Sequence, residues 1–230
     1  MCRWFVYVGP AEDPVDLHLL ITAPEHGILA QAKRKVAFCP GVVGTASAKA
    51  SRNHAINADG FGLGWYSQYS NIFPQGSLFR STETAWSSAN LAELCRVVSA
   101  SLCFAHIRSA SPGMVVASIN CHPFRHEQYM FMQNGGIARF CAVKRRLCAC
   151  LSDEAFHVIN GTTDTEHVFA AVVEVLCQTK RAALPAGGDC GATRLRADSC
   201  DAVARASEDG LRLAAALRTA KVTDEEVPAA

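Results

Sequence analysis

Aromatic and β-branched side chains gather in short runs along the chain, and these runs predict strands. The first run is CRWFVYV (2–8), which stops at Gly9 and Pro10, as is typical of a strand leading into a turn. The later runs are GFGLGWY (60–66), SLCFAHIR (101–108) and QYMFMQ (128–133). The last run ends in Asn-Gly-Gly (134–136), which predicts a hairpin turn.

Apolar residues at helical spacing predict two helices. The first starts at Asn90, an expected N-cap with Glu93 three residues on, and its apolar stripe is Leu91, Leu94, Cys95 and Val98. The second and clearer helix starts near Thr163, which has capping-box spacing to Glu166. Its expected stripe is Val168, Ala171, Val172, Val175 and Leu176.

The segments between these elements are irregular. Residues 24–58 are polar and contain Pro40 and Gly41, which predicts a long surface excursion. Beyond about residue 180 the chain is rich in Ala, Arg, Asp and Gly, with a candidate amphipathic helix at 201–219 and a polar end. Strands and helices mingled in this way indicate an α/β mixture but do not fix its topology.

Charge and hydropathy exclude several classes of protein. Lys and Arg together number 22 and Asp and Glu 21, and no basic run is long enough to form the footprint of a nucleic-acid binder. No apolar run approaches the roughly 18 residues of a membrane span, and no secretory signal opens the chain. We therefore expect a cytoplasmic protein that binds neither nucleic acid nor membrane.

The 11 cysteines are an odd number in a chain that is not short, which disfavours a disulfide scaffold and predicts reduced thiols. With 8 His also present, a zinc-binding protein is one alternative. However, the chain has no C-x-x-C pair, and the nearest approach is Cys148 with Cys150. Small buried thiols are therefore the favoured interpretation.

Cys2 is the main candidate for a catalytic nucleophile. Because it is small, it permits removal of Met1, which would leave a thiol and a free α-amine on one residue. An α-amine with a pKa near 8 can act as the base that activates its own side chain. The alternative is that Cys2 is an ordinary residue at the start of a strand.

A nucleophile acting on an acyl carbon also needs donors for an oxyanion and groups that hold the substrate. The amide of Asn134 and the N–H of Gly135 could supply the donors, or could simply form a hairpin turn. Arg108 could bind the carboxylate of an amino-acid-like substrate and Asp164 its ammonium. Their alternatives are a surface ion pair for Arg108 and a first-turn acid of a helix for Asp164.

Seven motifs in order resemble those of a known family: MCRWFVYVG (1–9), NADGFGLGWY (57–66), LFRSTETAW (78–86), AHIRSAS (105–111), NCHPF (120–124), FMQNGGIARF (131–140) and NGTTDTEHVFA (160–170). On these motifs, residues 2–177 resemble a class II, N-terminal-nucleophile glutamine amidotransferase domain. Within that class they are most similar to the stand-alone amidotransferases of cytosolic glutathione degradation. The resemblance implies cleavage of a γ-glutamyl amide bond through a thioester on Cys2, with glutathione or a γ-glutamyl peptide favoured over glutamine.

The resemblance also implies roles for single residues. Cys2 would be the nucleophile and Asn134 and Gly135 the oxyanion donors, while Arg108 and Asp164 would hold the carboxylate and the α-ammonium. Three further residues would line or brace the substrate pocket: His106, Ser111 and His122. Asp59 would support the loop around the site. No metal or cofactor is implied, and a metallopeptidase-like partner subunit is expected.

The implied fold is α+β, the four-layer α-β-β-α sandwich of N-terminal-nucleophile hydrolases, with two antiparallel sheets. Residues 2–180 would form the amidotransferase domain and residues 181–230 an atypical C-terminal segment. Since that segment is short, with GATRLRADS (191–199) as a remnant strand, we expect the second sheet to be incomplete or the tail to be rebuilt.

Two other positions depart from the family pattern. Gln133 stands where the family usually has His, and Ala58 stands where Gly is more usual in NADGFG. Gln keeps a hydrogen-bonding side chain but cannot titrate, so we expect altered positioning rather than loss of activity. An alternative function is a non-catalytic or weakly active interaction subunit of a glutathione-degrading complex.

Overall fold

The computed structural model describes residues 2–33, 56–66, 74–111 and 113–183. The chain divides into two compact units. The first comprises Met1–Gly135 and Asn160–Thr165, and the second comprises Gly136–Ile159 and Glu166–Ala230. The predicted strand at 191–199 and the predicted helix at 201–219 lie outside the described residues.

A four-stranded antiparallel sheet forms the centre of the first unit. Its strands are β1 (Arg3–Val8), β3 (Phe61–Tyr66), β4 (Ser77–Ser81) and β6 (Leu102–Ile107), in the order β1-β6-β3-β4. The strands predicted at 2–8, 60–66 and 101–108 are thereby confirmed. The register places Trp4 of β1 and Gly62 of β3 on either side of His106 of β6.

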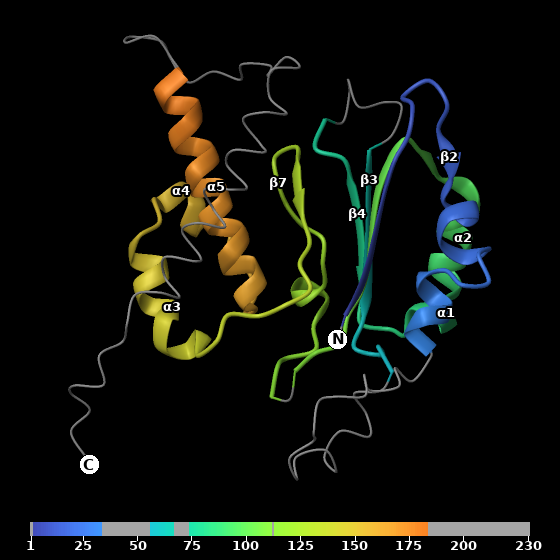
Figure 1. Ribbon diagram of the computed structural model, residues 1–230, viewed down its shortest axis with the longest axis horizontal. Helices are drawn as coiled ribbons and strands as arrows, with labels where there is room; N and C mark the ends of the chain where they lie inside the picture. The colour runs from blue at the N-terminus through green and yellow to red at the C-terminus, as the bar shows by residue number, and fades with distance from the viewer. Residues whose placement is uncertain (1, 34–55, 67–73, 112, 184–230) are drawn as a thin grey trace, which may run out of the picture. The chain divides into compact units, whose positions relative to one another are not determined.

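Two helices, α1 (Ile28–Lys33) and α2 (Ala89–Val97), cover one face of this sheet (Figure 1). The hydrophobic core lies between these helices and the sheet. It includes Ile28, Leu91, Cys95, Phe61 and Ala105. Beside the helices, β2 (Val15–Asp16) pairs with β5 (Ser99–Ala100). The prediction of an irregular excursion over residues 24–58 was wrong for α1, where Ile28 and Ala32 are buried against the core at helical spacing.

Helix α2 begins two residues earlier than the sequence pattern indicated. Its N-cap is Ser88, whose hydroxyl accepts a hydrogen bond from the main-chain N–H of Leu91 at 3.3 Å. The prediction of Asn90 as the cap was wrong, because Asn90 already lies inside the first turn. The predicted apolar stripe is confirmed, since Leu91 and Cys95 are buried and Leu94 and Val98 pack against the core.

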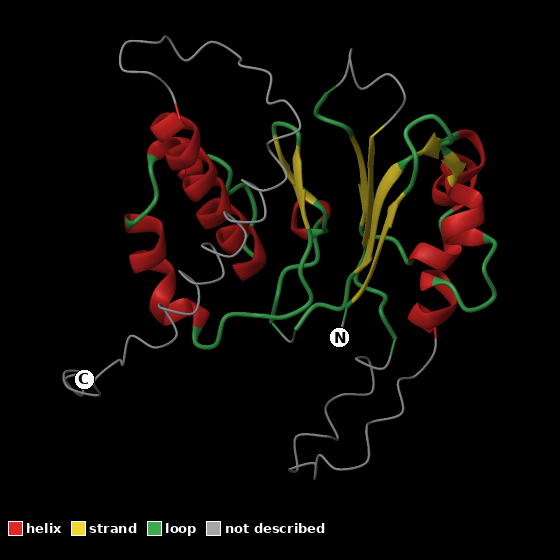
Figure 2. Ribbon diagram, turned by 45° about the horizontal axis from the view of Figure 1, so that its top comes forward, coloured by secondary structure: helices red, strands yellow, loops and turns green. Residues whose placement is uncertain are grey.

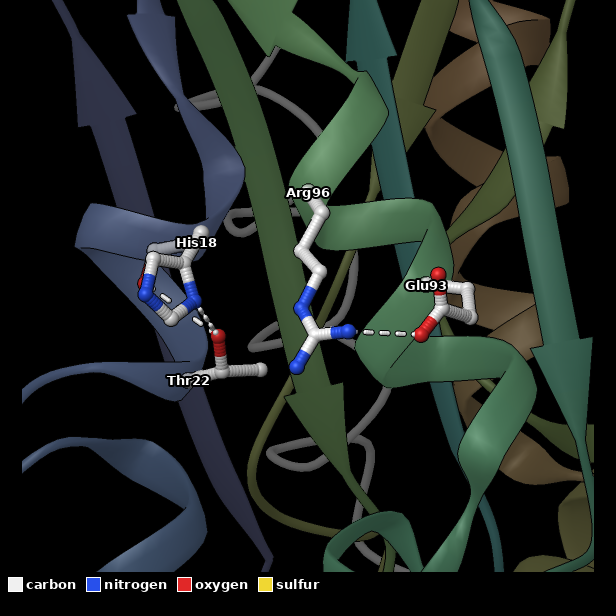
Figure 3. Close-up of polar contacts among 4 residues, drawn as sticks. All are labelled: His18, Thr22, Glu93 and Arg96. Carbon is white, nitrogen blue, oxygen red and sulfur yellow. Dashed lines mark hydrogen bonds and ion pairs between the residues drawn. The ribbon is translucent and has the colours of Figure 1, made fainter.

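The outer surface of this layer carries local polar contacts (Figure 3). Arg96 donates to Glu93 at 2.7 Å along the exposed side of α2. In the short π-helical turn η1 (His18–Thr22), the ring of His18 lies 2.6 Å from the hydroxyl of Thr22. Both pairs are exposed, so they contribute little to stability.

The other face of the sheet bears a short hairpin of β7 (Phe124–His126) and β8 (Tyr129–Phe131) (Figures 1 and 2). The hairpin region can approach β3 closely because Gly62 and Gly64 have no side chains there. A Cβ at Gly62 would lie 2.1 Å from the carbonyl oxygen of His122, and one at Gly64 would lie 2.5 Å from the sulfur of Met130.

The hairpin turn is not at Asn-Gly-Gly, and that prediction was wrong. The turn lies between β7 and β8, where Glu127 adopts a positive φ of 48°. Strand β8 ends at Phe131, and neither Gly135 nor Gly136 has the positive φ that a tight Asn-Gly turn requires. Residues 134–136 are instead a non-strand segment that leaves the hairpin.

Strand β1 ends the four-stranded sheet in the described part of the chain. Its alternate side chains Trp4, Val6 and Val8 are 56%, 38% and 75% exposed, whereas Phe5 and Tyr7 pack against the core. The strand therefore shows an apolar stripe on the sheet face that bears the hairpin.

Up to residue 183, where the described part ends, the second unit contains α3 (Phe140–Ala149), α4 (Asp153–Phe156) and most of α5 (Asp164–Ala183). The buried carboxylate of Glu174 on α5 joins two of these helices, since it accepts from the main-chain N–H of Ser152 at 2.7 Å and from its hydroxyl at 2.5 Å. Ser152 is also the N-cap of α4. The sequence pattern did not predict α3 or α4.

Helix α5 starts one residue after Thr163, as its capping-box pattern predicted. Its predicted stripe was only partly right, because Ala171 and Leu176 are buried but Val168, Val172 and Val175 are only half-buried. The other buried apolar side chains are Phe169, Ala170, Val173 and Cys177. Apolar residues occupy adjacent faces of this helix, so periodicity alone could not select the buried one.

The described chain is thus a mixed α/β protein with antiparallel sheets. Within its described part, no helix is both long and apolar enough to cross a membrane.

Candidate active site

Cys2 directly precedes β1, and its thiol lies against Ser109, two residues after the end of β6. The main-chain N–H of Ser109 donates to the Cys2 sulfur at 3.3 Å, and the sulfur lies 3.5 Å from the carbonyl oxygen of Ser109. Pairing of Arg3 with Ile107 brings these two strand ends together. Main-chain groups of the β6 end therefore hold the thiol in place.

Other thiols of the first unit are poorly suited to act as nucleophiles. Burial raises the pKa of both Cys95 and Cys103 to about 11, and it also raises the pKa of Cys121. All eight described cysteines are free thiols, and Cys2 is half-buried whereas these three are buried. Because the thiolate is the reactive form, the buried three are the less reactive thiols at neutral pH.

Asn134 reaches the nucleophile candidate from the segment after β8. Its side-chain amide nitrogen donates to the main-chain carbonyl oxygen of Cys2 at 3.1 Å. Asn134 and the adjacent Gly135 are exposed. An amide nitrogen carries two N–H groups, and this bond uses one of them.

Arg108 is the last residue before Ser109 and is only 5% exposed. One guanidinium nitrogen, Nη2, donates to the carbonyl oxygen of Val115 at 3.1 Å. The other, Nη1, is buried and has no hydrogen-bond partner among the described residues. A buried charged donor without a partner is costly, so this atom is well suited to receive an anionic group of a ligand.

The loop around Arg108 is braced by Asp59. The carboxylate of Asp59 accepts from the main-chain N–H of Ala110 at 2.8 Å, which is the supporting contact expected from the sequence. The main chain of Gly60 accepts from the N–H of Arg108 at 2.8 Å. The positive φ of this stretch belongs to Gly60, at 104°, and not to Ala58. Ala58 therefore carries no backbone strain from replacing a glycine.

Asp164 and Ser111 lie in the same unit as Cys2. Asp164 is the first residue of α5 and is half-buried, and its carboxylate accepts from the N–H of Thr165 at 2.9 Å. Ser111 is exposed, and its carbonyl oxygen accepts from the N–H of Met114 at 3.0 Å.

The rings of His106 and His122 contact each other in the interior, with centroids 4.1 Å apart and planes tilted by 42°. Burial is the main cause that lowers the pKa of His106 to about 4 and that of His122 to about 2, and the charge of Arg108 lowers both further. The rings are therefore neutral at neutral pH. With 1% and 5% exposure they are placed to brace the site rather than to contact a substrate.

The segment that carries Asn134 is attached to this pair of rings. The main-chain N–H of Gln133 donates to Nδ1 of His122 at 3.5 Å, a long hydrogen bond. The side-chain oxygen of Gln133 is buried without a partner among the described residues. Gln133 thus contacts the ring of His122 through its main chain rather than through its side chain.

Two residues of this region were missed by the sequence analysis. Ser109 contacts the thiol through main-chain atoms, which leave no signature in a sequence. Asn120 is 1% exposed and makes three side-chain hydrogen bonds in the same unit. Its signal was present, since it opens the NCHPF motif.

No group of three His, Cys, Asp or Glu side chains that could hold a metal ion occurs in the described ranges.

The fold and these contacts define a candidate thiol-nucleophile site, in which a cysteine at a strand end contacts an amide donor and the main chain of Ser109, the residue after the buried Arg108. The sequence profile of the family described as "Glutamine amidotransferases class-II" matches residues 32–205 of the chain. The chain therefore belongs to the class II glutamine amidotransferases.

Individual relatives agree with this family. The chain is 32% identical over 197 residues to "Probable glutamine amidotransferase DUG3" of Saccharomyces cerevisiae, a match that covers 85% of this chain and 51% of that protein. It is 24% identical over 139 residues to "Gamma-glutamyl-hercynylcysteine sulfoxide hydrolase" of Mycolicibacterium smegmatis, covering 60% of this chain and 52% of that protein. The chain spans about half the length of these curated relatives.

Among solved structures, the chain is similar to a glutamine aminotransferase class-II domain protein from Silicibacter pomeroyi. The two are 26% identical, with a TM-score of 0.48, and the match covers 73% of this chain and 61% of the other.

Proposed function

We propose that this protein hydrolyses the amide bond of a γ-glutamyl compound through a thioester on Cys2. The observation that carries the proposal is the hydrogen bond from the Asn134 amide to the main-chain carbonyl oxygen of Cys2, which brings an amide donor from a distant part of the chain to the residue that carries the thiol. Family membership supports the same assignment, because class II glutamine amidotransferases act on the γ-amide of glutamine.

The proposed reaction uses only groups of the chain and water. We propose that removal of Met1 frees the α-amine of Cys2, which takes the thiol proton as the sulfur attacks the γ-carbonyl carbon. The amide of Asn134 and the N–H of Gly135 stabilise the resulting oxyanion. The ammonium returns the proton to the leaving nitrogen, and the C–N bond breaks to leave a thioester. Water then cleaves the thioester, releasing glutamate and regenerating the thiol.

Three residues are proposed to hold the amino-acid head of the substrate. The unpartnered Nη1 of Arg108 suits a carboxylate, since an arginine fork binds both of its oxygens. The carboxylate of Asp164 suits an α-ammonium, and Ser111 lies in the loop that follows Arg108. In this scheme His106 and His122 brace the pocket as neutral rings.

The substrate class is proposed from the relatives. One relative is named as a probable glutamine amidotransferase and the other as a hydrolase of γ-glutamyl-hercynylcysteine sulfoxide, so the shared element that we propose is the γ-glutamyl group. Glutathione or a γ-glutamyl peptide is favoured over glutamine, because the motifs resemble those of glutathione-degrading amidotransferases. A metallopeptidase-like partner subunit and a cytoplasmic location belong to the same proposal.

We also propose that the domain, taken as residues 2–180, adopts the four-layer sandwich of N-terminal-nucleophile hydrolases. The support lies in the first unit, where α1 and α2 cover one face of the antiparallel sheet and β7 and β8 lie on its other face. Residues 181–230 would then form the atypical C-terminal segment of this chain.

The test is glutamate release from glutathione, γ-glutamyl dipeptides and glutamine, measured for wild type and Cys2→Ala. Cys141→Ala is the matched control, because Cys141 is an exposed thiol on α3. We expect release by wild type and the control and none by Cys2→Ala, with an intact mass that shows loss of Met1. Equal release by all three proteins would exclude the proposal, and absence of any thioester would favour the non-catalytic subunit.

A further inference from the structure

The side chain of Asn120 lies at the end of the short 3-10 turn η5 (Ser118–Asn120) and is 1% exposed. Its nitrogen donates to the carbonyl oxygen of Val115 and to the hydroxyl of Thr162, both at 3.1 Å. Its oxygen accepts from the main-chain N–H of Thr162 at 2.9 Å. A carbonyl can only accept and an N–H can only donate, so these partners fix the orientation of the amide.

One of these bonds connects Asn120 to the candidate carboxylate anchor. The carbonyl oxygen of Val115 accepts from Asn120 and also from Nη2 of Arg108 at 3.1 Å. A carbonyl oxygen has two lone pairs, so both donors can be accommodated. The position of Arg108, and with it the direction of its unpartnered Nη1, is therefore coupled to Asn120.

The other two bonds connect Asn120 to the candidate ammonium anchor. Thr162 precedes Asp164, the first residue of α5, by two positions. Residues Asn160–Thr165 belong to the first unit although the chain on both sides of them belongs to the second. The paired bonds between Asn120 and Thr162 hold this segment beside residues 115–120.

We propose that Asn120 is a positioning residue that sets the spacing of Arg108 and Asp164, and so selects substrates with the α-carboxylate and α-ammonium of an amino acid. The proposal rests on the proposed function and assigns to it the residue that determines head-group recognition. Asn120 acts through Arg108 and Thr162 and does not touch the reacting atoms. Its loss therefore weakens binding of the head group and leaves the thiol chemistry intact.

The test compares two electrophiles that alkylate Cys2. Iodoacetamide needs only the thiol, whereas 2-amino-5-chloro-4-oxopentanoate, a chloromethyl ketone, also carries the α-carboxylate and α-ammonium of glutamate. Wild type is expected to react with the chloromethyl ketone in a saturable manner. In Asn120→Asp, which keeps the acceptor for Thr162 but loses both donor bonds, the half-saturating concentration should rise at least about tenfold. The maximal rate at which the chloromethyl ketone alkylates this variant, and the rate at which iodoacetamide does, should both stay within about twofold of wild type.

Thr162→Val provides a second variant that is expected to fold, because Thr162 is exposed and only one of the three bonds is lost. Its half-saturating concentration should rise about threefold, and the double variant should show less than the product of the two effects. Ser118→Ala, in the same turn, is the matched control and should behave as wild type. Circular dichroism and urea unfolding of each variant confirm that it is folded.

An unchanged half-saturating concentration of the chloromethyl ketone in both Asn120→Asp and Thr162→Val would overturn the inference. The proposed function would still stand if the reaction of wild type with this reagent is saturable. Equal slowing with both electrophiles in folded variants would also overturn it, because Asn120 would then support the thiol rather than the head group. A wild-type protein that shows no saturation with the chloromethyl ketone would remove the proposed function itself.

Discussion

The side-chain amide of Asn134 donates a hydrogen bond to the main-chain carbonyl oxygen of Cys2 at 3.1 Å, although 132 positions separate the two residues. This bond joins the start of β1 to the segment that follows β8. One N–H of the amide is used in holding the nucleophile residue, and the second is available to a ligand. In the proposed reaction the same side chain orients Cys2 and stabilises the oxyanion that forms there.

Replacing Asn134 with Ala should lower kcat by about 10²–10³-fold, which is the usual effect of removing one oxyanion donor. KM should change by no more than about threefold, since Asn134 is not expected to bind the amino-acid head. Asn134→Asp should behave similarly because a carboxylate cannot donate. Steady-state kinetics with a γ-glutamyl dipeptide provide the measurement. A raised KM with unchanged kcat would show that Asn134 binds substrate in its ground state.

Replacing Arg108 with Lys should raise KM by about tenfold or more while kcat changes less, because an ammonium keeps the charge but loses the planar fork. The short reach of Lys also removes the bond from Nη2 to the carbonyl oxygen of Val115. Arg145→Lys on the exposed surface of α3 is the matched control and should leave both parameters unchanged. A loss of kcat alone would place Arg108 in the chemical step instead.

Three of the four strands of the sheet were predictable because their signal is local, whereas β4 was not predicted. Residues 3–8 and 102–107 combine β-branched and aromatic side chains with clear ends, and each strand formed where the pattern placed it. The cap of α2 was not predictable, since Ser88 and Asn90 are both good caps and the choice depends on where the chain leaves the extended conformation. Asn134 and Gly135 could have formed a hairpin only if the chain beyond them returned as a strand.

The residues of the candidate site likewise divide into those that the sequence could predict and those that it could not. Cys2 and Asn134 could be nominated from their chemistry and from the motifs around them, and the structure brings them into contact. The role of Ser109 could not be predicted, because it contacts the thiol through the main-chain N–H that every residue except proline possesses. The bridging bonds of Asn120 depend on a long-range contact with Thr162, which no local pattern specifies.

Stability should depend on pH through the two buried rings of His106 and His122. Burial lowers the pKa of His106 to about 4 and that of His122 to about 2, whereas an unfolded histidine titrates near 6.5. As the pH falls, the unfolded chain takes up these protons first. The free energy of unfolding should therefore be insensitive to these rings above about pH 6.5 and should decrease as the pH falls from there toward 4.

Urea unfolding at about pH 7.5 and about pH 5 measures this dependence. His106→Gln should be less stable than wild type at the higher pH, because a buried ring is lost. Its free energy of unfolding should, however, decrease less than that of wild type between the higher and the lower pH. His157→Gln, which removes an exposed ring at the end of α4, should keep the wild-type dependence. The same dependence in His106→Gln as in wild type would mean that His106 does not contribute to it.

Replacing Gly62 with Ala should destabilise the protein and impair its active site together. The added Cβ would lie 2.1 Å from the carbonyl oxygen of His122, a main-chain atom that cannot rotate away. Overpacking of this kind costs about 1–3 kcal/mol, so the thermal midpoint should fall by about 2–12 °C. Because the ring of His122 accepts from the N–H of Gln133, movement of residue 122 should also displace the adjacent Asn134 and lower kcat.

Gly27→Ala is the comparison variant for Gly62→Ala, since its Cβ would meet its nearest atoms, in Pro24, at 3.1 Å, where a shift of a few tenths of an ångström relieves the contact. It should change the thermal midpoint by less than about 2 °C and leave kcat intact. If the two variants were equally stable and equally active, the close approach of residue 122 to β3 would not be needed to hold the candidate site. If Gly62→Ala lost stability but kept kcat, the position of Asn134 would have to be fixed independently of His122, through its bond to Cys2.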